Sequence, residues 1–242
     1  SEKFAGADMS PDGNYLAAFG EAGTVVLWNT VSGQEVNRWK APPPLLMVDF
    51  PRTVLRFGGT RLFLLDAAGR MHAFFPHQGK EIYVQEADAS TMAVSPDGSR
   101  LITCGESQAR LWDTATGRKI AELSKHKGNV FDASFSHDGS KVATAAEDGS
   151  VIIWNAQNGS ELAKLDGPQK IPLTRVRFDE RDQRIVAGGN NGILRLWDPA
   201  TRKVLADLNR PGDTHEITAL GFSSDGKWLA STTHGSNVVL WD

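Results

Sequence analysis

Short apolar stretches alternate with polar turns along the whole chain, and residues 128–166 show the arrangement most clearly. Residues 130–135 alternate between polar and apolar side chains, which predicts a half-buried strand. Residues 141–145, 150–154 and 161–165 predict three further strands. The segments between them are rich in Asp, Asn and Gly, which favour tight turns. The pattern therefore predicts a four-stranded antiparallel sheet whose strands are joined by hairpin turns.

The third strand of this unit has a pattern of its own. Residues 25–27, 151–153 and 238–240 are apolar at every position. A sheet with one face in water would instead alternate between polar and apolar positions. We therefore expect these strands to be covered on both faces, as happens when like sheets stack around an axis.

A Trp followed by Asp or Asn closes the third strand in five places: Trp28–Asn29, Trp112–Asp113, Trp154–Asn155, Trp197–Asp198 and Trp241–Asp242. Successive Trp residues are 84, 42, 43 and 44 positions apart, so the first step spans two periods. A degenerate copy is therefore expected in between. The glycines that flank the other Trp residues have counterparts around Phe74, which places Phe74 at the Trp position and Phe75 at the Asp position. A period of this length is typical of stacked supersecondary units.

The repeat gives six copies, with approximate boundaries 4–40, 53–86, 87–124, 128–166, 171–209 and 215–242. Because no residues are left over for a second domain, residues 1–242 are predicted to form one domain. Copy six stops at the end of its third strand. We therefore expect the chain to be part of a longer protein; the alternative is a complete six-membered ring whose last sheet is deficient.

The chain resembles the WD40 β-propeller family over its full length. The Trp-Asp pairs carry the resemblance together with turns of the form Ser-x-Asp-Gly, which occur at residues 10–13, 95–98, 136–139 and 223–226. The resemblance implies an all-β fold, a WD40-type β-propeller with six repeats of four-stranded antiparallel blades. The last blade would lack its fourth strand within this chain.

In this family a His before the first strand joins a hydroxyl, an Asp and the Trp in a buried hydrogen-bonded set. Carried over to copy four, the resemblance implies a structural set of His126, Thr144, Asp148 and Trp154. The set contains the residue types of a hydroxyl–imidazole–carboxylate triad, but burial of such a set favours a structural role. Copy two departs furthest from the family pattern, so we expect it to be the most irregular copy and copy four the best ordered.

No other motif predicts catalysis or a bound group. The Gly-rich residues 188–192 lack the helix and the Lys-Ser/Thr of a phosphate loop. His215–Glu216 has no second His at metalloprotease spacing, and no Gly-x-Ser-x-Gly nucleophile elbow occurs. We therefore predict no catalytic residues, no metal site and no cofactor, and a protein that is not an enzyme.

Composition narrows the choice of partner. The chain is 40% hydrophobic and 23% charged, with a net charge of −3 and no basic stripe, so nucleic acid is not an expected partner. No apolar run approaches the roughly 20 residues that span a bilayer, so a membrane is not expected either. Cys104 is the single cysteine, which favours a reducing compartment and a cytoplasmic location.

The family resemblance places partner binding on one rim, which is formed by the turns between second and third strands and by the connections between copies. The candidate residues there are Phe19, Glu21, Glu106, Gln108, Lys125, Glu147, Lys170, Asn190, Asn191 and His234. Phe19 is the first choice, because an aromatic side chain in a turn can serve as an exposed anchor. The alternative is that Phe19 packs inward.

Three functions fit these observations. The leading hypothesis is a non-enzymatic protein–protein interaction scaffold that binds a protein or peptide through a copy-specific rim. The first alternative is a sensor or regulatory propeller of a larger multidomain protein of kinase or NTPase type. The second alternative is a propeller enzyme. Fold similarity alone cannot identify the partner.

Overall fold

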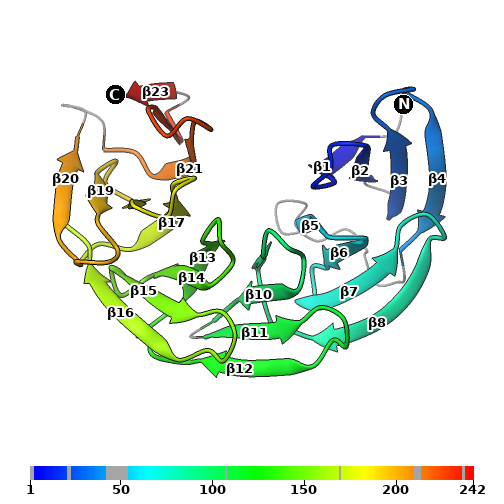
Figure 1. Ribbon diagram of the computed structural model, residues 1–242, viewed down its shortest axis with the longest axis horizontal. Helices are drawn as coiled ribbons and strands as arrows, with labels where there is room; N and C mark the ends of the chain where they lie inside the picture. Colours follow the sequence, from blue (N-terminus) through cyan, green and yellow to red (C-terminus); the bar gives the residue numbers. More distant parts are fainter. Residues whose placement is uncertain are drawn as a thin grey trace. The chain divides into compact units, whose positions relative to one another are not determined.

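The computed structural model describes residues 3–20, 23–41, 54–106, 108–168, 170–209, 214–235 and 238–242. Within these residues, 23 strands form six antiparallel sheets and no residue is helical (Figure 1). Five sheets have four strands each and the last has three, and in every sheet the strands follow one another in chain order. The predicted all-β fold, the four-stranded sheets and the shorter last sheet are confirmed.

The chain divides into two compact units, and each is described by itself. The first unit is Ser1–Thr103 with Trp112–Lys119, and the second is Cys104–Leu111 with Ile120–Asp242. The first unit contains β1 (Phe4–Met9), β2 (Tyr15–Gly20), β3 (Thr24–Asn29), β4 (Glu35–Lys40), β5 (Val54–Gly58), β6 (Arg61–Leu65), β7 (Arg70–Phe75) and β8 (Lys80–Glu86). The division passes through the third sheet, β9 (Thr91–Val94), β10 (Arg100–Cys104), β11 (Ala109–Asp113) and β12 (Lys119–Leu123).

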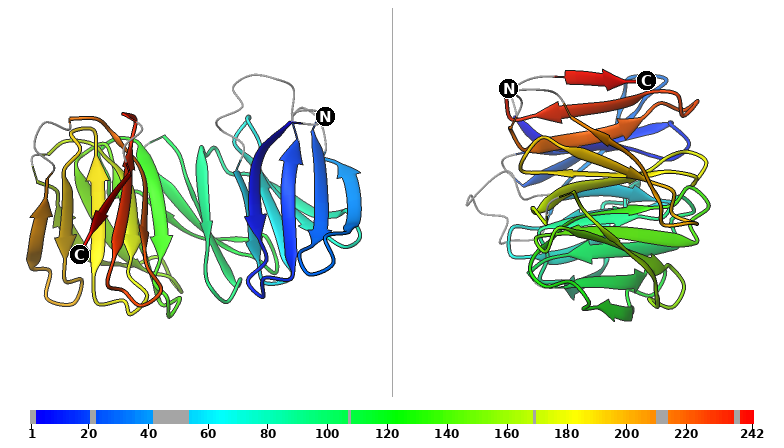
Figure 2. Two further views of the ribbon diagram at one scale, coloured as in Figure 1. Left: turned by 90° about the horizontal axis from the view of Figure 1, so that it is seen from above. Right: turned by 90° about the vertical axis from the view of Figure 1, so that its left-hand side faces the viewer.

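The second unit contains the remaining three sheets. Its strands are β13 (Val130–Phe135), β14 (Lys141–Ala146), β15 (Ser150–Asn155), β16 (Glu161–Asp166), β17 (Leu173–Phe178), β18 (Ile185–Gly189), β19 (Leu194–Trp197), β20 (Val204–Leu208), β21 (Ile217–Phe222), β22 (Leu229–Thr233) and β23 (Val238–Trp241). The strands of one unit run along a common direction, so their turns collect at two ends (Figure 2).

Strand register confirms that copy two is the hidden copy. Leu62 pairs with Phe74 in the way that Leu16 pairs with Trp28 and Val142 with Trp154. A register shift then occurs immediately before Phe74, as it does before both Trp residues. Phe74 is 1% exposed, so it fills the buried position of the Trp.

The first two strands of copy two pair without a register shift. The pairing of β5 with β6 runs through five residue pairs without a shift, whereas β1–β2, β13–β14, β17–β18 and β21–β22 each contain one. The expectation that copy two is the most irregular is therefore wrong for the pairing of its first two strands. Its departures from the other copies lie in a turn and in a polar side-chain set, which are described below.

The third strands β3 and β15 are covered on both faces, as their sequences predict. The same prediction is wrong for residues 238–240, because β23 is the edge strand of its three-stranded sheet and leaves Val238 71% and Leu240 65% exposed. In β15 every residue except Asn155 is buried, and in β3 the first four residues are buried. The fourth strands β4 and β16 are largely exposed instead. In the four-stranded sheets each third strand therefore lies inside the sheet and each fourth strand forms the outer edge.

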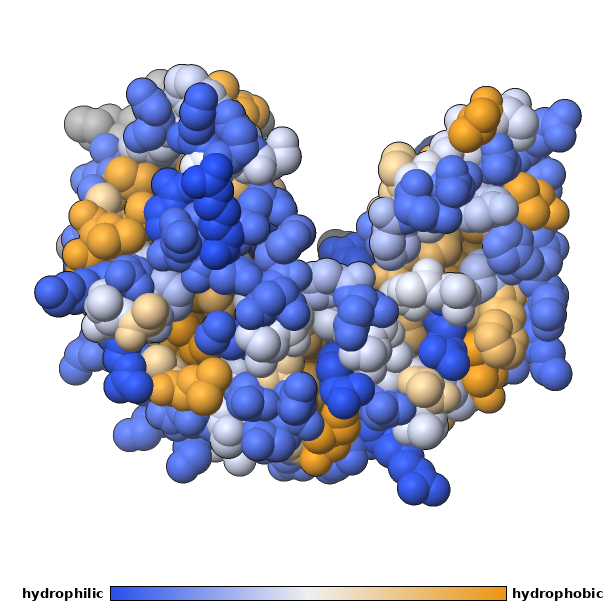
Figure 3. All heavy atoms as spheres, viewed as in Figure 1, coloured by the Kyte–Doolittle hydropathy of each residue, from blue (hydrophilic) through white to orange (hydrophobic). Residues whose placement is uncertain are grey.

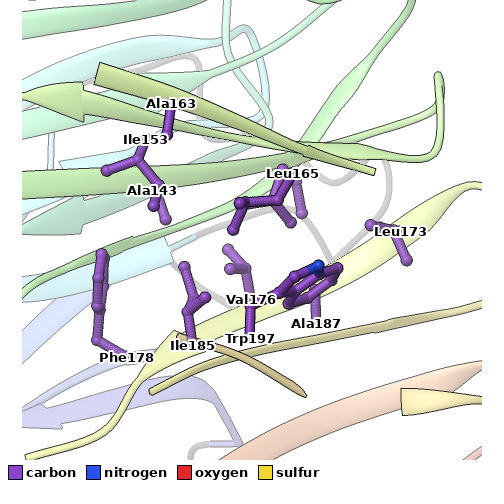
Figure 4. Packing of buried hydrophobic residues seen from close by; sticks show 12 residues of the cluster. Ala143, Ile153, Ala163, Leu165, Leu173, Val176, Phe178, Ile185, Ala187 and Trp197 are labelled. Carbon is purple, nitrogen blue, oxygen red and sulfur yellow. The ribbon is translucent and has the colours of Figure 1, made fainter. Parts of the chain in front are cut away.

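Neighbouring sheets within a unit pack through apolar side chains. In Figure 4, Ala143 and Ile153 of copy four point toward Val176, Ile185 and Trp197 of copy five. All five are buried, and burial of such side chains stabilises the fold by roughly 25 cal/mol per Å² of apolar surface.

Hydrogen bonds between first strands also join neighbouring sheets. The Asp8 carboxylate accepts a hydrogen bond from the Phe57 backbone N–H at 2.7 Å. In the second unit, the Asp132 carboxylate accepts one from Val176 N–H at 3.1 Å and pairs with the Arg177 guanidinium at 2.5 Å. The sheets within each unit are thereby held in a fixed order and orientation.

Candidate binding rim

In the second unit, the turns between second and third strands meet the connections between copies. Glu147 N–H donates to Asn129 O at 2.8 Å, and His234 N–H donates to Glu216 O at 3.1 Å. We call this end the connection rim and define it by residues 105, 106, 108, 125–129, 147–149, 170–172, 190–192 and 234–235. The Ser-x-Asp-Gly turns lie at the other end of the same strands.

Phe19 is not an exposed anchor, and that prediction is wrong. Its side chain is 3% exposed and packs in a core cluster with Val25, Leu27 and Leu62. The reason is that β2 continues to Gly20, so Phe19 belongs to a strand rather than to the following turn. The structure instead shows the alternative, in which the Phe19 side chain packs inward. Glu21, the neighbouring candidate, lies outside the described residues.

Most of the remaining candidates are exposed on the connection rim; these are Glu106, Lys125, Glu147, Lys170, Asn190 and His234. Gln108 and Asn191 are half-buried. The Gln108 carboxamide lies between the side chains of Glu122 and Arg110, and Asn191 Oδ1 accepts a hydrogen bond from Ile193 N–H at 3.3 Å. The exposed group therefore offers charged and amide side chains from four different copies.

The backbone that carries these side chains is held in place. Asn129 N–H donates to Glu147 Oε2 at 3.1 Å, and Lys127 N–H donates to Asp148 Oδ2 at 3.0 Å. Glu147 is thus an exposed candidate and also an anchor for the connection that carries Lys125. A fixed connection presents its side chains at a lower ordering cost on binding.

The structural set expected in copy four is a connected group beneath this rim. His126 Nε2 lies 2.8 Å from Thr144 Oγ1, and His126 Nδ1 lies 3.2 Å from Asp148 Oδ1. The Trp154 indole N–H donates to Thr144 Oγ1 at 2.9 Å. Thr144 is completely buried, so its hydroxyl has no access to a substrate. The group ties a connection to β14 and β15.

Electrostatics match this structural role. Burial lowers the pKa of His126 below its usual range, even though the Asp148 carboxylate is close. Burial opposes the charge of Asp148, but hydrogen bonds from Ser150 and from Lys127 N–H lower its pKa to about 2. A neutral imidazole beside an ionised carboxylate donates one N–H and accepts one hydrogen bond.

A second buried polar set, in copy two, was missed by sequence reasoning. His72 is buried, with Nε2 3.1 Å from Asp66 Oδ2 and Nδ1 2.7 Å from Glu81 Oε1. Its ring stacks on Phe74 with centroids 6.3 Å apart. The sequence signal that could have revealed this set is a His in a third strand, at the register position that Ile152 occupies in copy four.

The described residues contain no group of three or more His, Cys, Asp or Glu side chains arranged to hold a metal ion. None of the segments that the structure describes forms a helix long and apolar enough to cross a membrane. On the face shown in Figure 3, polar side chains predominate and apolar side chains form separate patches.

Comparison with known proteins identifies the repeats. Residues 78–113, 117–155, 159–198 and 204–242 match the family model described as "WD domain, G-beta repeat". The chain is similar to the guanine nucleotide-binding protein subunit beta of Nicotiana tabacum, with 29% identity over 164 residues. It is 30% identical over 165 residues to the Arabidopsis thaliana protein of the same name. Each of these two matches covers 64% of this chain and 44% of the relative.

A protein with a different name is similar to a comparable extent. The serine-threonine kinase receptor-associated protein of Gallus gallus is 32% identical over 156 residues, covering 64% of this chain and 43% of that protein. The chain thus spans less than half the length of the relatives that it matches.

Proposed function

This chain belongs to the WD40 repeat family, and from that membership we propose that it is a non-enzymatic protein-interaction scaffold whose connection rim binds a protein or peptide. The observation that carries the proposal is the exposure of charged and amide side chains from four copies on turns fixed by hydrogen bonds. Copy-specific side chains on a repeated framework provide a surface that can differ from one family member to another.

The names of the relatives support this proposal. One relative is named as a subunit of a guanine nucleotide-binding protein and another as a protein associated with a kinase receptor, and both names describe assembly with other proteins. For this chain we infer the same class of activity, which is binding to other proteins, but we do not assign it the partners of those relatives. The burial of Thr144 and His126 supports a scaffold over an enzyme, because no reactant reaches the set in copy four.

The charges on the rim suggest how the proposal can be tested. Lys125 and Lys170 are exposed and belong to the connections before copies four and five. We propose that reversing both charges, Lys125→Glu with Lys170→Glu, weakens partner binding, because charged groups at an interface rim steer association and exclude wrong partners. Lys227→Glu is the matched control, since Lys227 is also exposed but directly follows the Ser-x-Asp-Gly turn of copy six, at the other end of the strands.

The assay is quantitative co-purification of partners with the wild-type chain, the double variant and the control. The proposal expects the partners of the wild type to be lost from the double variant and retained by Lys227→Glu. If the double variant retains every partner, or if the control loses them, the connection rim is not the binding surface.

A further inference from the structure

The turn between the first and second strands is shorter in copy two than in its neighbours. β5 ends at Gly58 and β6 begins at Arg61, so Gly59 and Thr60 alone form this turn. In copy one residues 10–14 separate the two strands, and in copy three residues 95–99 do so. The turns on either side therefore extend beyond the hairpin of copy two.

A cavity of about 320 Å³ lies over this short hairpin, and every residue that lines it belongs to the first unit. The lining residues are Ser10, Pro11, Asp12, Tyr15, Phe57, Gly59, Thr60, Pro76, His77 and Pro96. We call it the proline pocket. It lies at the end of the strands opposite to the connections between copies, and it draws its walls from copies one, two and three.

The floor of the proline pocket is held firmly. The Phe57 N–H donates to the Asp8 carboxylate at 2.7 Å. The turn of copy three packs directly on the hairpin, because a Cβ added at Gly98 would collide with the backbone of Gly59. A Phe57 side chain that is 8% exposed closes the base. A preformed pocket of this kind binds without a large ordering cost.

The walls of the pocket are mostly apolar and consist largely of side chains with rings. Pro11, Pro76 and Pro96 each contribute to them. Tyr15 and His77 meet edge to face, with ring centroids 4.6 Å apart and planes at 86°. Such walls accept an aliphatic stem and offer a ring to a cation.

Asp12 gives the pocket its carboxylate. Ser10 Oγ donates to Asp12 Oδ1 at 2.6 Å, Asn14 N–H donates to the same oxygen at 3.1 Å, and the Asn14 amide donates to Oδ2 at 2.8 Å. These hydrogen bonds lower the pKa of Asp12 below its usual range. A carboxylate has about four acceptor sites, so Oδ2 keeps one for a ligand.

We propose that the proline pocket binds an arginine side chain that an extended segment of a partner protein inserts. The occupant follows from the chemistry of the lining, which contains a carboxylate and no Lys or Arg. The aliphatic stem of arginine packs on proline and ring surfaces, while its guanidinium stacks on an aromatic ring and pairs with a carboxylate. A purely apolar ligand would cover Asp12 without pairing it, which opposes binding.

The size of the pocket agrees with this occupant. A volume of about 320 Å³ is at the lower end of the range for ligand sites, which extends from about 300 to 1,000 Å³. It suits one long side chain better than the face of a helix. The site is separate from the connection rim, so its test does not depend on the function proposed there.

The test is an NMR titration of the full chain with the peptide Ac-Ala-Arg-Ala-NH2. Peptides with Gln or Glu in place of Arg measure the role of charge, and Ac-Ala-Pro-Pro-Ala-NH2 measures proline recognition. We expect the Arg peptide, at up to about 10 mM, to shift the amide resonances of Gly59, Thr60 and Tyr15, because a millimolar Kd is visible at that concentration. The Gln peptide should bind at least about threefold more weakly, and the Glu peptide should not bind.

Two variants test whether binding depends on the carboxylate of Asp12 in the pocket or on any Asp in a Ser-x-Asp-Gly turn. Asp12→Asn should weaken binding of the Arg peptide about threefold to fivefold, which is typical of one exposed ion pair. Asp225→Asn is the control, because Ser223 Oγ also donates to Asp225 at 2.6 Å but that turn lies in copy six. It should leave binding unchanged.

A further variant removes one wall without touching the core. His77 is exposed, and His77→Ala should also weaken binding of the Arg peptide. The proposal is overturned if the hairpin resonances do not move, or if the Gln peptide or the proline peptide binds as tightly as the Arg peptide. It is also overturned if Asp12→Asn and Asp225→Asn have equal effects.

Discussion

Replacing Thr144 by Val tests whether the set in copy four acts as one unit. The two side chains have nearly the same shape, but Val lacks the hydroxyl that connects His126 Nε2 with the Trp154 indole N–H. Thr144 is completely buried and Trp154 is 2% exposed, so bulk solvent does not reach the position of the lost oxygen.

Copy three provides a matched control for the size of the effect. Thr103 is equally buried and accepts a hydrogen bond from the Trp112 indole N–H at 2.9 Å. Leaving one buried donor unsatisfied costs about 1–3 kcal/mol. Thr103→Val should cost about that much, whereas Thr144→Val also leaves the His126 ring nitrogen without its partner. We therefore expect Thr144→Val to be more destabilising by about 1–2 kcal/mol.

The assay is urea unfolding followed by Trp fluorescence, because neither variant removes a Trp. The difference in the free energy of unfolding is read from the shift of the midpoint at unchanged slope. If Thr103→Val costs as much as Thr144→Val, then His126 contributes nothing through Thr144. The set would then be a pair of residues with an adjacent histidine.

The two buried histidines should give opposite pH dependences. Burial opposes the charge of His72, but hydrogen bonds to two carboxylates raise its pKa, so its contribution to stability is full below about pH 6.5 and is lost as the pH rises through the folded pKa. His126, whose pKa burial lowers, contributes fully above about pH 6.5 and loses this contribution as the pH falls. Urea unfolding of His72→Gln and His126→Gln at about pH 5.5 and about pH 8 checks this, and equal slopes for both would contradict it. Burial raises the pKa of the Cys104 thiol well above its usual range, so a thiol reagent should modify Cys104 only after unfolding; rapid modification of the native chain would show that the site opens. Gly13 and Gly98 share a φ of +72°, yet a Cβ has open space at Gly13 and meets backbone at Gly98. Gly98→Ala should therefore lower the melting temperature more than Gly13→Ala, and an equal loss would mean that the close approach does not matter.

Much of the fold could be predicted because the repeat is periodic. Spacing alone located Phe74, although neither the Trp nor the Asp is present in copy two, and the register in β6 and β7 confirms it. The apolar third strands of copies one and four predicted cover on both faces in the same way, whereas the third strand of copy six is exposed. Both inferences use patterns that recur in several copies, so one degenerate copy does not hide them.

The rim candidates could be predicted less well. Phe19 was assigned to a turn, and a shift of one or two residues in a strand boundary places it in the core instead. The set around His72 was missed because its residues come from a turn and two strands, and strand pairing alone brings them together. A side chain in a repeat protein can thus be assigned to a copy more reliably than to a surface.

The proline pocket had a signal in the sequence that was not used. Copy two lacks the Ser-x-Asp-Gly turn that copies one and three possess. In the sequence, the missing turn indicated only that copy two is degenerate. In the structure it shortens one hairpin between two longer turns, and that difference in length creates the cavity.

The central claim is that a protein partner binds the connection rim, and amide hydrogen exchange tests it most directly. The exchange of the chain alone is compared with that of the chain in complex with a co-purified partner. The account predicts that residues 125–129, 147–149 and 170–172 become protected in the complex. Protection confined to the Ser-x-Asp-Gly turns at residues 136–139 and 223–226, with none on the connection rim, would contradict it.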